Sequence, residues 1–362
     1  MQVDRYLFDF SVFLTFSIRI GVVWLLCYVC SRLLRQPSQR FVLWLIFSLG
    51  SAAYWIVALI DFIFLAQDRT FIYLHSRSLA QIVVSASWQP VFAALTWLLG
   101  GAYMVGLVVL CSFRLWNRLR LRRLLRFGLQ PSIEFSAGLE KLCREMGVKR
   151  CKLVILPGIA SPATAYWLHP HIIFPELAHR PEKLAEFLHI LRHELVHVVR
   201  RDYLLSSLVD ATCTLLFFHP AVWAARRQMR LERELACDRE VVQACPEYRA
   251  DYAASLTQFV RLSLITKRSF SNVPFSSPAS LLGRRIRSIL VDPVPPPAWN
   301  RFSSASLAVT ILMTVALFAP QFSVSVDMAT HVGPRFTSVR TMMVAQRMKR
   351  HIRFTENGLP IR

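Results

Sequence analysis

Acidic side chains are scarce in this chain. Its 362 residues include 22 aspartates and glutamates against 43 lysines and arginines, which gives a formal net charge of +21 at pH 7. A large basic excess is typical of nucleic-acid-binding proteins and of membrane proteins whose inner loops carry positive charge. No nucleic-acid recognition motif accompanies the basic residues. We therefore expect no direct nucleic-acid partner, and the charge favours a membrane protein.

Regular cysteine spacing, a cleavable leader and internal repeats are also missing. The eight cysteines are scattered, which argues against a disulfide framework and suits a reducing compartment. The first apolar run has no small-residue cleavage site, and another apolar run soon follows it. We therefore expect this first run to be a membrane span and not a secretory signal peptide.

Apolar residues, in contrast, make up 54% of the chain, which is more than a typical soluble domain contains. The excess is concentrated in four runs, at residues 7–30, 41–66, 90–113 and 305–326. Each run is long enough to cross about 30 Å of hydrocarbon as a helix. The sequence predicts a polytopic α-helical membrane protein with four transmembrane helices, surrounded by membrane lipids.

The distribution of arginines predicts how the chain is oriented. Residues 31–40 and 114–126 are rich in arginine, whereas the loop at residues 67–89 carries only two. Because positively charged loops stay in the cytoplasm, we predict a multi-pass protein of the inner (plasma) membrane with a cytoplasmic middle domain. The predicted parts are a three-helix membrane domain (1–113), the cytoplasmic domain (114–301), the fourth helix (302–326) and a short extracytoplasmic tail (327–362). The basic charge of that tail opposes this orientation.

The middle domain has the pattern of a mainly helical α+β fold. We predict strands at residues 151–156 and 164–174, and helices at residues 137–146, 181–203, 221–244 and 246–264. The apolar run at residues 204–225 is long enough for a fifth span. Asp210, His219 and Pro220 argue against a simple crossing. We expect a buried or interfacial helix that turns at residues 218–220.

The predicted helix at residues 181–203 contains the sequence His193-Glu194-Leu195-Val196-His197. Two histidines four residues apart lie one turn apart on the same face of a helix, so both imidazoles can reach one zinc ion. Glu194, between them, lies close enough to act on a metal-bound water. The alternative is a pair of surface histidines beside a glutamate. A third protein ligand would decide, since catalytic zinc sites normally use three.

The candidate for the third ligand is Glu234, with Glu232 and Glu240 as rivals. Asp238 follows Glu234 by one helical turn on the same face, where it could bond the outward nitrogen of a ligand histidine. Glu232 is rotated by about 200° from Glu234, and Ala236 stands one turn after it. This difference favours Glu234, although the surrounding arginines also suit a solvated helix face.

Three blocks together, at residues 193–202, 218–223 and 227–238, resemble the BlaR/MecR-type membrane zinc peptidases. The order of three spans, a zinc domain and a fourth span also fits that family. The resemblance implies a gluzincin-like domain in which His193, His197 and Glu234 bind one Zn2+ per chain and Glu194 is the catalytic base. It implies that the substrate, cleaved as part of signal transduction, is a cytoplasmic protein, for example a transcriptional repressor, or the chain itself.

The resemblance does not extend to the C-terminus. Antibiotic-sensing members of the family carry a penicillin-binding domain after the last span, whereas residues 327–362 contain neither S-x-x-K nor K-T-G. We therefore expect no direct acylation by β-lactams. Two other functions stay open, namely a Ste-type membrane quality-control or maturation peptidase and a signal relay without proteolytic activity.

Two further features are candidates for substrate handling. The predicted strand at residues 164–174 includes Ala165, Tyr166, Trp167 and Leu168, which could pair with an extended substrate. The alternative is an ordinary edge strand. His219 is either a second electrophile for the oxyanion or a structural residue at a helix start.

Overall fold

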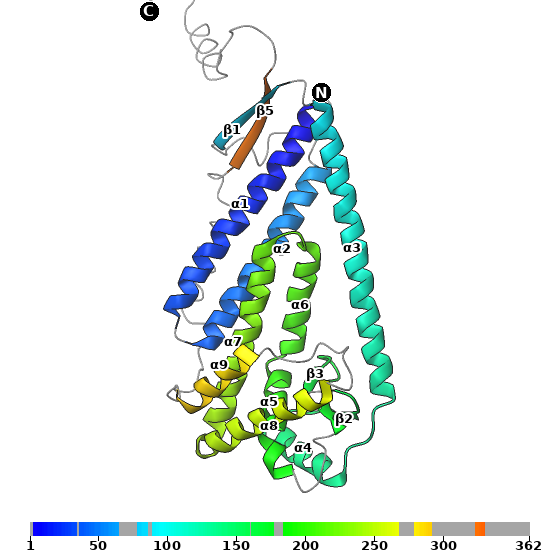
Figure 1. The fold of residues 1–362 in the computed structure, drawn as a ribbon, viewed down its shortest axis with the longest axis vertical. Coiled ribbons are helices and arrows are strands. Elements are labelled where there is room, and N and C mark those ends of the chain that lie inside the picture. The colour runs from blue at the N-terminus through cyan, green and yellow to red at the C-terminus, as the bar shows by residue number, and fades with distance from the viewer. Residues whose placement is uncertain are drawn as a thin grey trace, which may run out of the picture.

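The computed structural model describes residues 3–34, 36–64, 78–85, 89–159, 161–176, 184–267, 279–291 and 323–329. Long helices form an elongated bundle, and a smaller lobe with helices and a short sheet lies at one end of it (Figure 1). The three longest helices are α1 (Val3–Leu33), α2 (Pro37–Phe64) and α3 (Gln89–Arg126). The lobe contains the segment with the paired histidines.

Each of these three helices contains a segment that is long and apolar enough to cross a membrane: Phe16–Leu33, Pro37–Ile60 and Ala94–Arg126. The first three predicted spans are therefore confirmed as helices. Helix α3 continues unbroken through the arginine-rich segment. Residues 305–322 of the predicted fourth span lie outside the described residues. Its last residues, 323–326, belong to a strand, β5 (Ser323–Ala329), and so the predicted helix does not extend to Val326.

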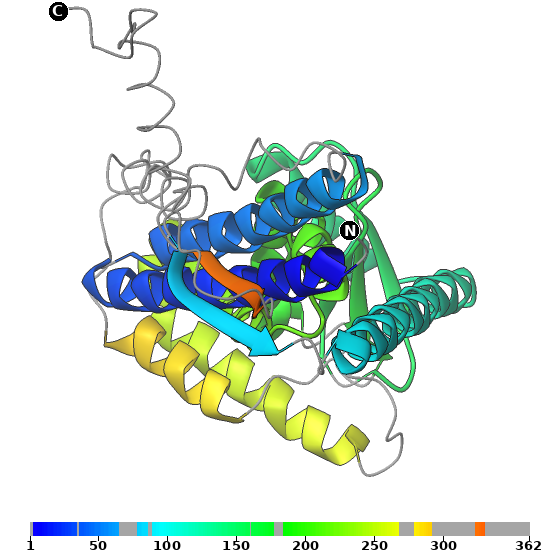
Figure 2. The ribbon, with the colours of Figure 1, turned by 90° about the horizontal axis from the view of Figure 1, so that it is seen from above.

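Strand β5 pairs in parallel with β1 (Ser78–Ser85) at the end of the bundle that is far from the lobe (Figure 1). Seen from above, the two strands cross over α1 (Figure 2). Strand β1 belongs to the loop predicted to lie outside, and β5 overlaps the start of the predicted extracytoplasmic tail. Their pairing is compatible with a position on the same side of the membrane.

The lobe begins with α4 (Ile133–Glu145) and a sheet of three strands, β2 (Lys152–Leu156), β3 (Ala163–Ala165) and β4 (His171–Pro175). The strand order is β2-β4-β3, with β2 parallel and β3 antiparallel to β4. The single strand predicted at residues 164–174 is therefore wrong, because the chain reverses between β3 and β4. Tyr166, in the left-handed region at φ 61°, starts this reversal. Strand β3 forms an edge of the sheet.

Five further helices follow in the described part of the chain: α5 (Leu184–Val199), α6 (Asp202–Leu215), α7 (Pro220–Ala244), α8 (Arg249–Lys267) and α9 (Ala279–Leu290). A short 3-10 turn, Pro246–Tyr248, precedes α8. The helix predicted to run to residue 203 breaks after Val199, since Arg201 adopts a left-handed conformation at φ 57°. The sequence did not predict α9, which lies beside α8 (Figure 2).

Helices α6 and α7 form a hairpin that packs between the membrane helices (Figure 1). Phe16, Trp44 and Phe47 of α1 and α2 share a buried cluster with Val209 of α6 and Val222 of α7. The apolar run at residues 204–225 is thus a buried hairpin that turns at residues 216–219, close to the predicted turn. Helix α7 extends from this buried cluster between the membrane helices into the lobe.

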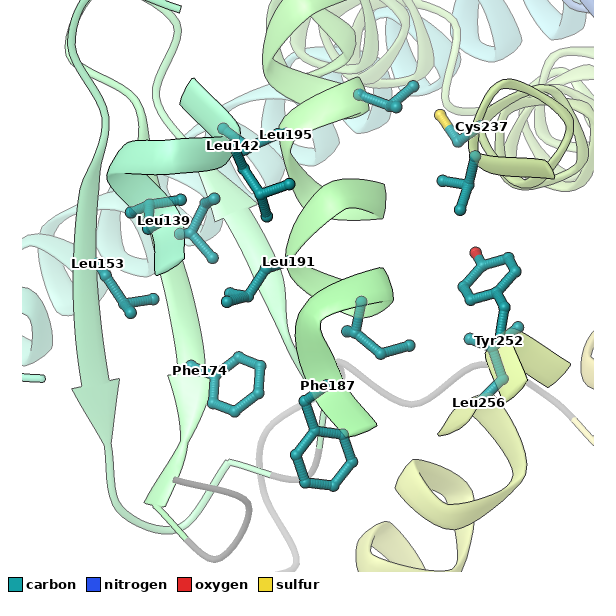
Figure 3. Close-up of a cluster of buried hydrophobic side chains, with 14 of the residues drawn as sticks. Leu139, Leu142, Leu153, Phe174, Phe187, Leu191, Leu195, Cys237, Tyr252 and Leu256 are labelled. Carbon is teal, nitrogen blue, oxygen red and sulfur yellow. The ribbon is translucent and has the colours of Figure 1, made fainter. Parts of the chain in front are cut away.

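Packing in the lobe fixes the rotation of α5 about its axis. Leu191 and Leu195 point from α5 toward the sheet, where they join Leu153 and Phe174, whereas Tyr252 of α8 lies on the opposite side of α5 (Figure 3). All five side chains are buried. Because one face of α5 is held against the sheet, its histidines are directed toward α7 and α8.

Candidate metal centre

Three predicted metal ligands lie together between α5 and α7. His193, His197 and Glu234 are buried, and one ligand atom from each lies within 4.8 Å of the other two. The Nε2 atoms of His193 and His197 are 3.5 Å and 3.8 Å from the two Glu234 oxygens. The two imidazole rings are nearly perpendicular, with centroids 4.8 Å apart. These are the three residues that the sequence and the family resemblance predicted.

The rival carboxylates of α7 point elsewhere. Glu232 is buried and lies 3.2 Å from the guanidinium of Arg40 in α2. Glu240 accepts a hydrogen bond of 3.0 Å from Arg200. Glu232 and Glu240 thus lie on other faces of α7 than Glu234, in agreement with the rotation per residue of a helix.

Asp238 lies behind His193, as predicted. Its Oδ1 atom is 3.2 Å from His193 Nδ1, and Tyr252 donates its hydroxyl proton to the same carboxylate. Arg285 of α9 donates to both Asp238 oxygens, at 2.7 Å and 2.8 Å. Burial alone would raise the pKa of Asp238, but Arg285 and the hydrogen bond with His193 hold it well below its usual range. Asp238 is therefore an anion that can accept the Nδ1 proton of His193.

Asp202 has the same place behind His197. The Oδ2 atom of Asp202 is 2.8 Å from His197 Nδ1, and Arg200 donates its Nε proton to that oxygen at 3.2 Å. Burial opposes ionisation of Asp202, but its contacts with His197 and Arg200 lower its pKa. The buried Cys237 thiol also faces this carboxylate, at 3.4 Å. Each histidine thus has a buried carboxylate at Nδ1, which leaves Nε2 for a metal ion.

Sequence reasoning assigned no role to Asp202, Arg200, Arg285 or Tyr252. Asp202 stands five residues after His197, a spacing that reaches the same imidazole only because the helix breaks at Arg201. Arg285 belongs to a helix that was not predicted. No clear local signal in the sequence marks the helix break that brings Asp202 to His197.

The predicted catalytic base contacts the edge strand. Glu194 is buried, and Thr164 of β3 donates its hydroxyl proton to Glu194 Oε2 at 2.7 Å. Among the four predicted substrate-strand residues, Ala165 lies in β3, whereas Tyr166, Trp167 and Leu168 follow it in the reversal. The strand segment beside Glu194 is therefore Ala163–Ala165, shorter than predicted.

The charges of the cluster fit a divalent cation. Burial would raise the pKa of Glu234, but Arg233, 2.8 Å away, and the hydrogen bond with His193 lower it well below its usual range. In the metal-free protein, burial and Arg285 disfavour protonation of His193. Hydrogen bonds with Asp238 and Glu234 outweigh them and raise the His193 pKa from 6.5 to about 9. A protonated imidazole thus supplies positive charge between two buried carboxylates.

A metal ion can take over the role of that proton. The Nε2 atoms of both imidazoles face the Glu234 carboxylate, and Arg285 Nη2 also lies 3.3 Å from His193 Nε2. Two imidazole nitrogens and one carboxylate are the donor set that catalytic zinc sites use. The three side chains are buried and come from two packed helices, so little ordering would accompany binding. The residues therefore fit Zn2+.

His219 lies at the other end of α7. It caps that helix by accepting a hydrogen bond from Ala221 N at 3.3 Å, and its Nε2 atom is 3.1 Å from the Ser17 carbonyl oxygen of α1. Glu234 follows 15 residues later, which is about 22 Å along a helix. This placement corresponds to the structural one of the two predicted roles.

Apolar helices that carry a lobe with these residues define a membrane protein with a metallopeptidase-type site. A sequence model of the family described as "BlaR1 peptidase M56" matches residues 7–289. The chain therefore belongs to this family. It is also similar to "Regulatory protein BlaR1" of Bacillus licheniformis, with 24% identity over 192 residues. The match covers 52% of this chain and 32% of that relative, so the chain spans about a third of the relative's length.

Proposed function

We propose that this chain is a membrane zinc endopeptidase that hydrolyses a peptide bond in a cytoplasmic protein as part of signal transduction. The observation that carries the proposal is the convergence of His193, His197 and Glu234, with Glu194 beside them on the same helix. Membership of a peptidase family supports the reaction type. The name of the relative, a regulatory protein, supports the signalling role. A transcriptional repressor is the substrate candidate that the family resemblance implies.

The residues of the site suggest how the reaction proceeds. His193, His197 and Glu234 would hold the zinc ion, which when bound makes water more acidic and polarises a carbonyl group. Glu194 accepts the water proton and delivers it to the leaving amine. Thr164 holds the Glu194 carboxylate through its 2.7 Å hydrogen bond. Asp202 and Asp238 keep the Nδ1 protons of the two histidines in place.

Strand β3 is the proposed docking edge for the substrate. Among the described strands it pairs with β4 alone, on one side, so an extended peptide could add to its other side by main-chain hydrogen bonds. Thr164 lies in the middle of β3 and contacts the proposed base. A peptide paired with β3 would therefore pass beside Glu194.

The topology supports a cytoplasmic position for the site. The lobe adjoins the arginine-rich end of α3 (Figure 1), and positive charge favours the cytoplasmic side. The chain leaves α9 beside the lobe and reaches β5 at the opposite end of the bundle (Figure 1). These positions at opposite ends of the bundle favour the predicted fourth crossing of the membrane between α9 and β5.

A comparison of wild-type and Glu194→Gln cells tests the proposal. The variant should retain zinc, because no ligand changes, but should lose cleavage, because an amide does not accept the proton. New N-termini that depend on Glu194 would be identified across the proteome. One regulatory substrate would support the signalling role, and many membrane protein substrates would favour a Ste-type enzyme. Unchanged N-termini together with unchanged signalling in the variant would support a relay without proteolysis.

A further inference from the structure

The first turn of α2 contacts both helical elements that carry the proposed ligands. Arg40 Nε lies 3.2 Å from Glu232 Oε2 on α7. The adjacent ring of Phe41, which is buried, lies under the guanidinium of Arg200, with 5.4 Å between Cζ and the ring centroid. Arg200 follows α5 directly along the chain. Two consecutive residues of a membrane helix thus bridge α5 and α7.

Phe41 is connected to His197 through Arg200 and Asp202. Arg200 is held between the Phe41 ring, Asp202 at 3.2 Å and Glu240 at 3.0 Å. Asp202 in turn lies 2.8 Å from His197 Nδ1. The side chain of Arg200 is only 5% exposed, so its position depends on these three partners. A shift of Phe41 therefore changes the support of the carboxylate that orients His197.

The contact of Arg40 with Glu232 affects the position of Glu234, because both glutamates belong to α7. Glu232 is buried and stands two residues before Glu234 on α7. A carboxylate in such surroundings needs a charged partner, and Arg40 provides one from α2. The ion pair therefore favours one position of α7 relative to α2, and with it the position of Glu234 relative to α5.

We propose that the first turn of α2 is a positioning element of the metal centre, in which Arg40 and Phe41 hold α7 and Arg200 so that Glu234 and His197 face the same ion. This inference rests on the proposed metal site. It gives the membrane domain a role beyond anchoring, because a displacement of α2 relative to the lobe would alter metal affinity and coordination geometry. Arg40 acts through Glu232 and Phe41 through Arg200, so both are positioning residues.

The test uses the full chain in lipid nanodiscs, stripped of metal. Zinc affinity is measured by competition with a chromophoric chelator, and the visible spectrum of the Co2+-loaded protein reports coordination geometry. Phe41→Leu keeps an apolar side chain but removes the aromatic face, and we expect about a tenfold loss of zinc affinity, the lower end for residues that support ligands. The cobalt spectrum should also change. Phe41→Tyr, which keeps the ring, should restore both.

Phe47→Leu is the matched control. Phe47 is buried in the same helix and the same apolar cluster, but lies six residues further on, about 9 Å along α2. This variant should lower thermal stability and leave zinc affinity and the cobalt spectrum unchanged. An equal loss of affinity in both leucine variants would mean general destabilisation and would overturn the proposal.

The ion pair gives a second, independent arm. Arg40→Glu and Glu232→Arg should each weaken zinc binding, and the double variant should recover a large part of the loss. If Phe41→Leu does not fold, this arm decides alone. Wild-type affinity in Phe41→Leu and in both charge variants would refute the positioning role while leaving the metal site intact. Failure of the proposed function differs, because the wild type would then show the same cobalt spectrum as His197→Ala.

Discussion

Asp202 gives the sharpest test of how the centre is supported. Asp202→Asn preserves the size of the side chain and an oxygen that can accept the His197 Nδ1 proton, but removes the negative charge. Asp202 is 1% exposed and lies 2.8 Å from His197 and 3.2 Å from Arg200. The variant therefore weakens a charge-assisted hydrogen bond and leaves Arg200 with Glu240 as its remaining anionic partner in the described structure.

The expected loss can be estimated from these contacts. Replacing the partner of a ligand histidine usually costs about 10–100-fold in metal affinity, which is about 1.4–2.7 kcal/mol. We expect the upper half of this range, because the amide also loses its ion pair with Arg200. The metal-free protein should lose about 1–3 kcal/mol of unfolding free energy, since the Arg200 guanidinium is buried and keeps only part of its charge compensation.

Chelator competition measures the zinc affinity, and Asp210→Asn is the control. Asp210 lies on the same helix, α6, and pairs with Arg226 and Arg114, but its side chain is 32% exposed. Asp210→Asn should leave zinc affinity within about twofold of wild type, a difference of roughly 0.4 kcal/mol. Wild-type affinity in Asp202→Asn, or an equal loss in both variants, would refute the assigned role of Asp202.

Four other predictions concern the proposed ligands and base. Glu234→Ala should abolish measurable zinc binding and cleavage, and Glu232→Ala should reduce zinc affinity far less; the reverse order in chelator competition would overturn the ligand assignment. Zinc uptake near neutral pH should release a proton from His193, because its metal-free pKa is about 9, so that apparent affinity rises with pH up to about 9. Calorimetry in buffers of different ionisation enthalpy would detect the proton. The raised pKa also stabilises the folded metal-free protein fully below pH 6.5, and thermal unfolding should reveal a loss of this contribution as pH rises through about 9. Thr164→Val should keep zinc but lower kcat, because the hydrogen bond to Glu194 is lost, and Thr164→Ser should restore kcat. An unchanged kcat in the valine variant would exclude a role for the Thr164 hydroxyl in positioning Glu194.

The part of the site that follows a single helical period was predictable from sequence. His193 and His197 are one turn apart, and so are Glu234 and Asp238, and both pairs face the centre as expected. Asp202 was missed because it depends on a left-handed residue that is not glycine, and such conformations have no clear local signal. Arg285 was missed for another reason, since it reaches His193 from 92 residues away.

The sheet shows the same difference between local and long-range information. Residues 151–156 were predicted as a strand from their apolar side chains, and residues 152–156 form β2. The pattern at residues 164–174 also favours extended backbone, but it does not encode the reversal after β3. Tertiary pairing of β3 with β4 decides where the strand ends. The sequence therefore predicted that the segment beside Glu194 is extended, but not where the strand ends.

The contacts of α2 also imply an effect in the opposite direction. If the position of α2 alters zinc affinity, then zinc binding must shift the position or rigidity of α2 by the same coupling free energy. A tenfold effect on affinity corresponds to about 1.4 kcal/mol, which is large enough to be detected in amide exchange.

We therefore expect zinc to slow hydrogen exchange in the first turns of α2, around Arg40 and Phe41, in the wild-type protein. Zinc-dependent protection should be lost in Phe41→Leu and retained in Phe47→Leu, because only Phe41 lies on Arg200 in the described contacts. Exchange near residue 60, at the opposite end of α2, serves as the internal reference. Identical exchange of the first turns with and without zinc would show that the metal centre and α2 are uncoupled, whatever the affinity of the variants.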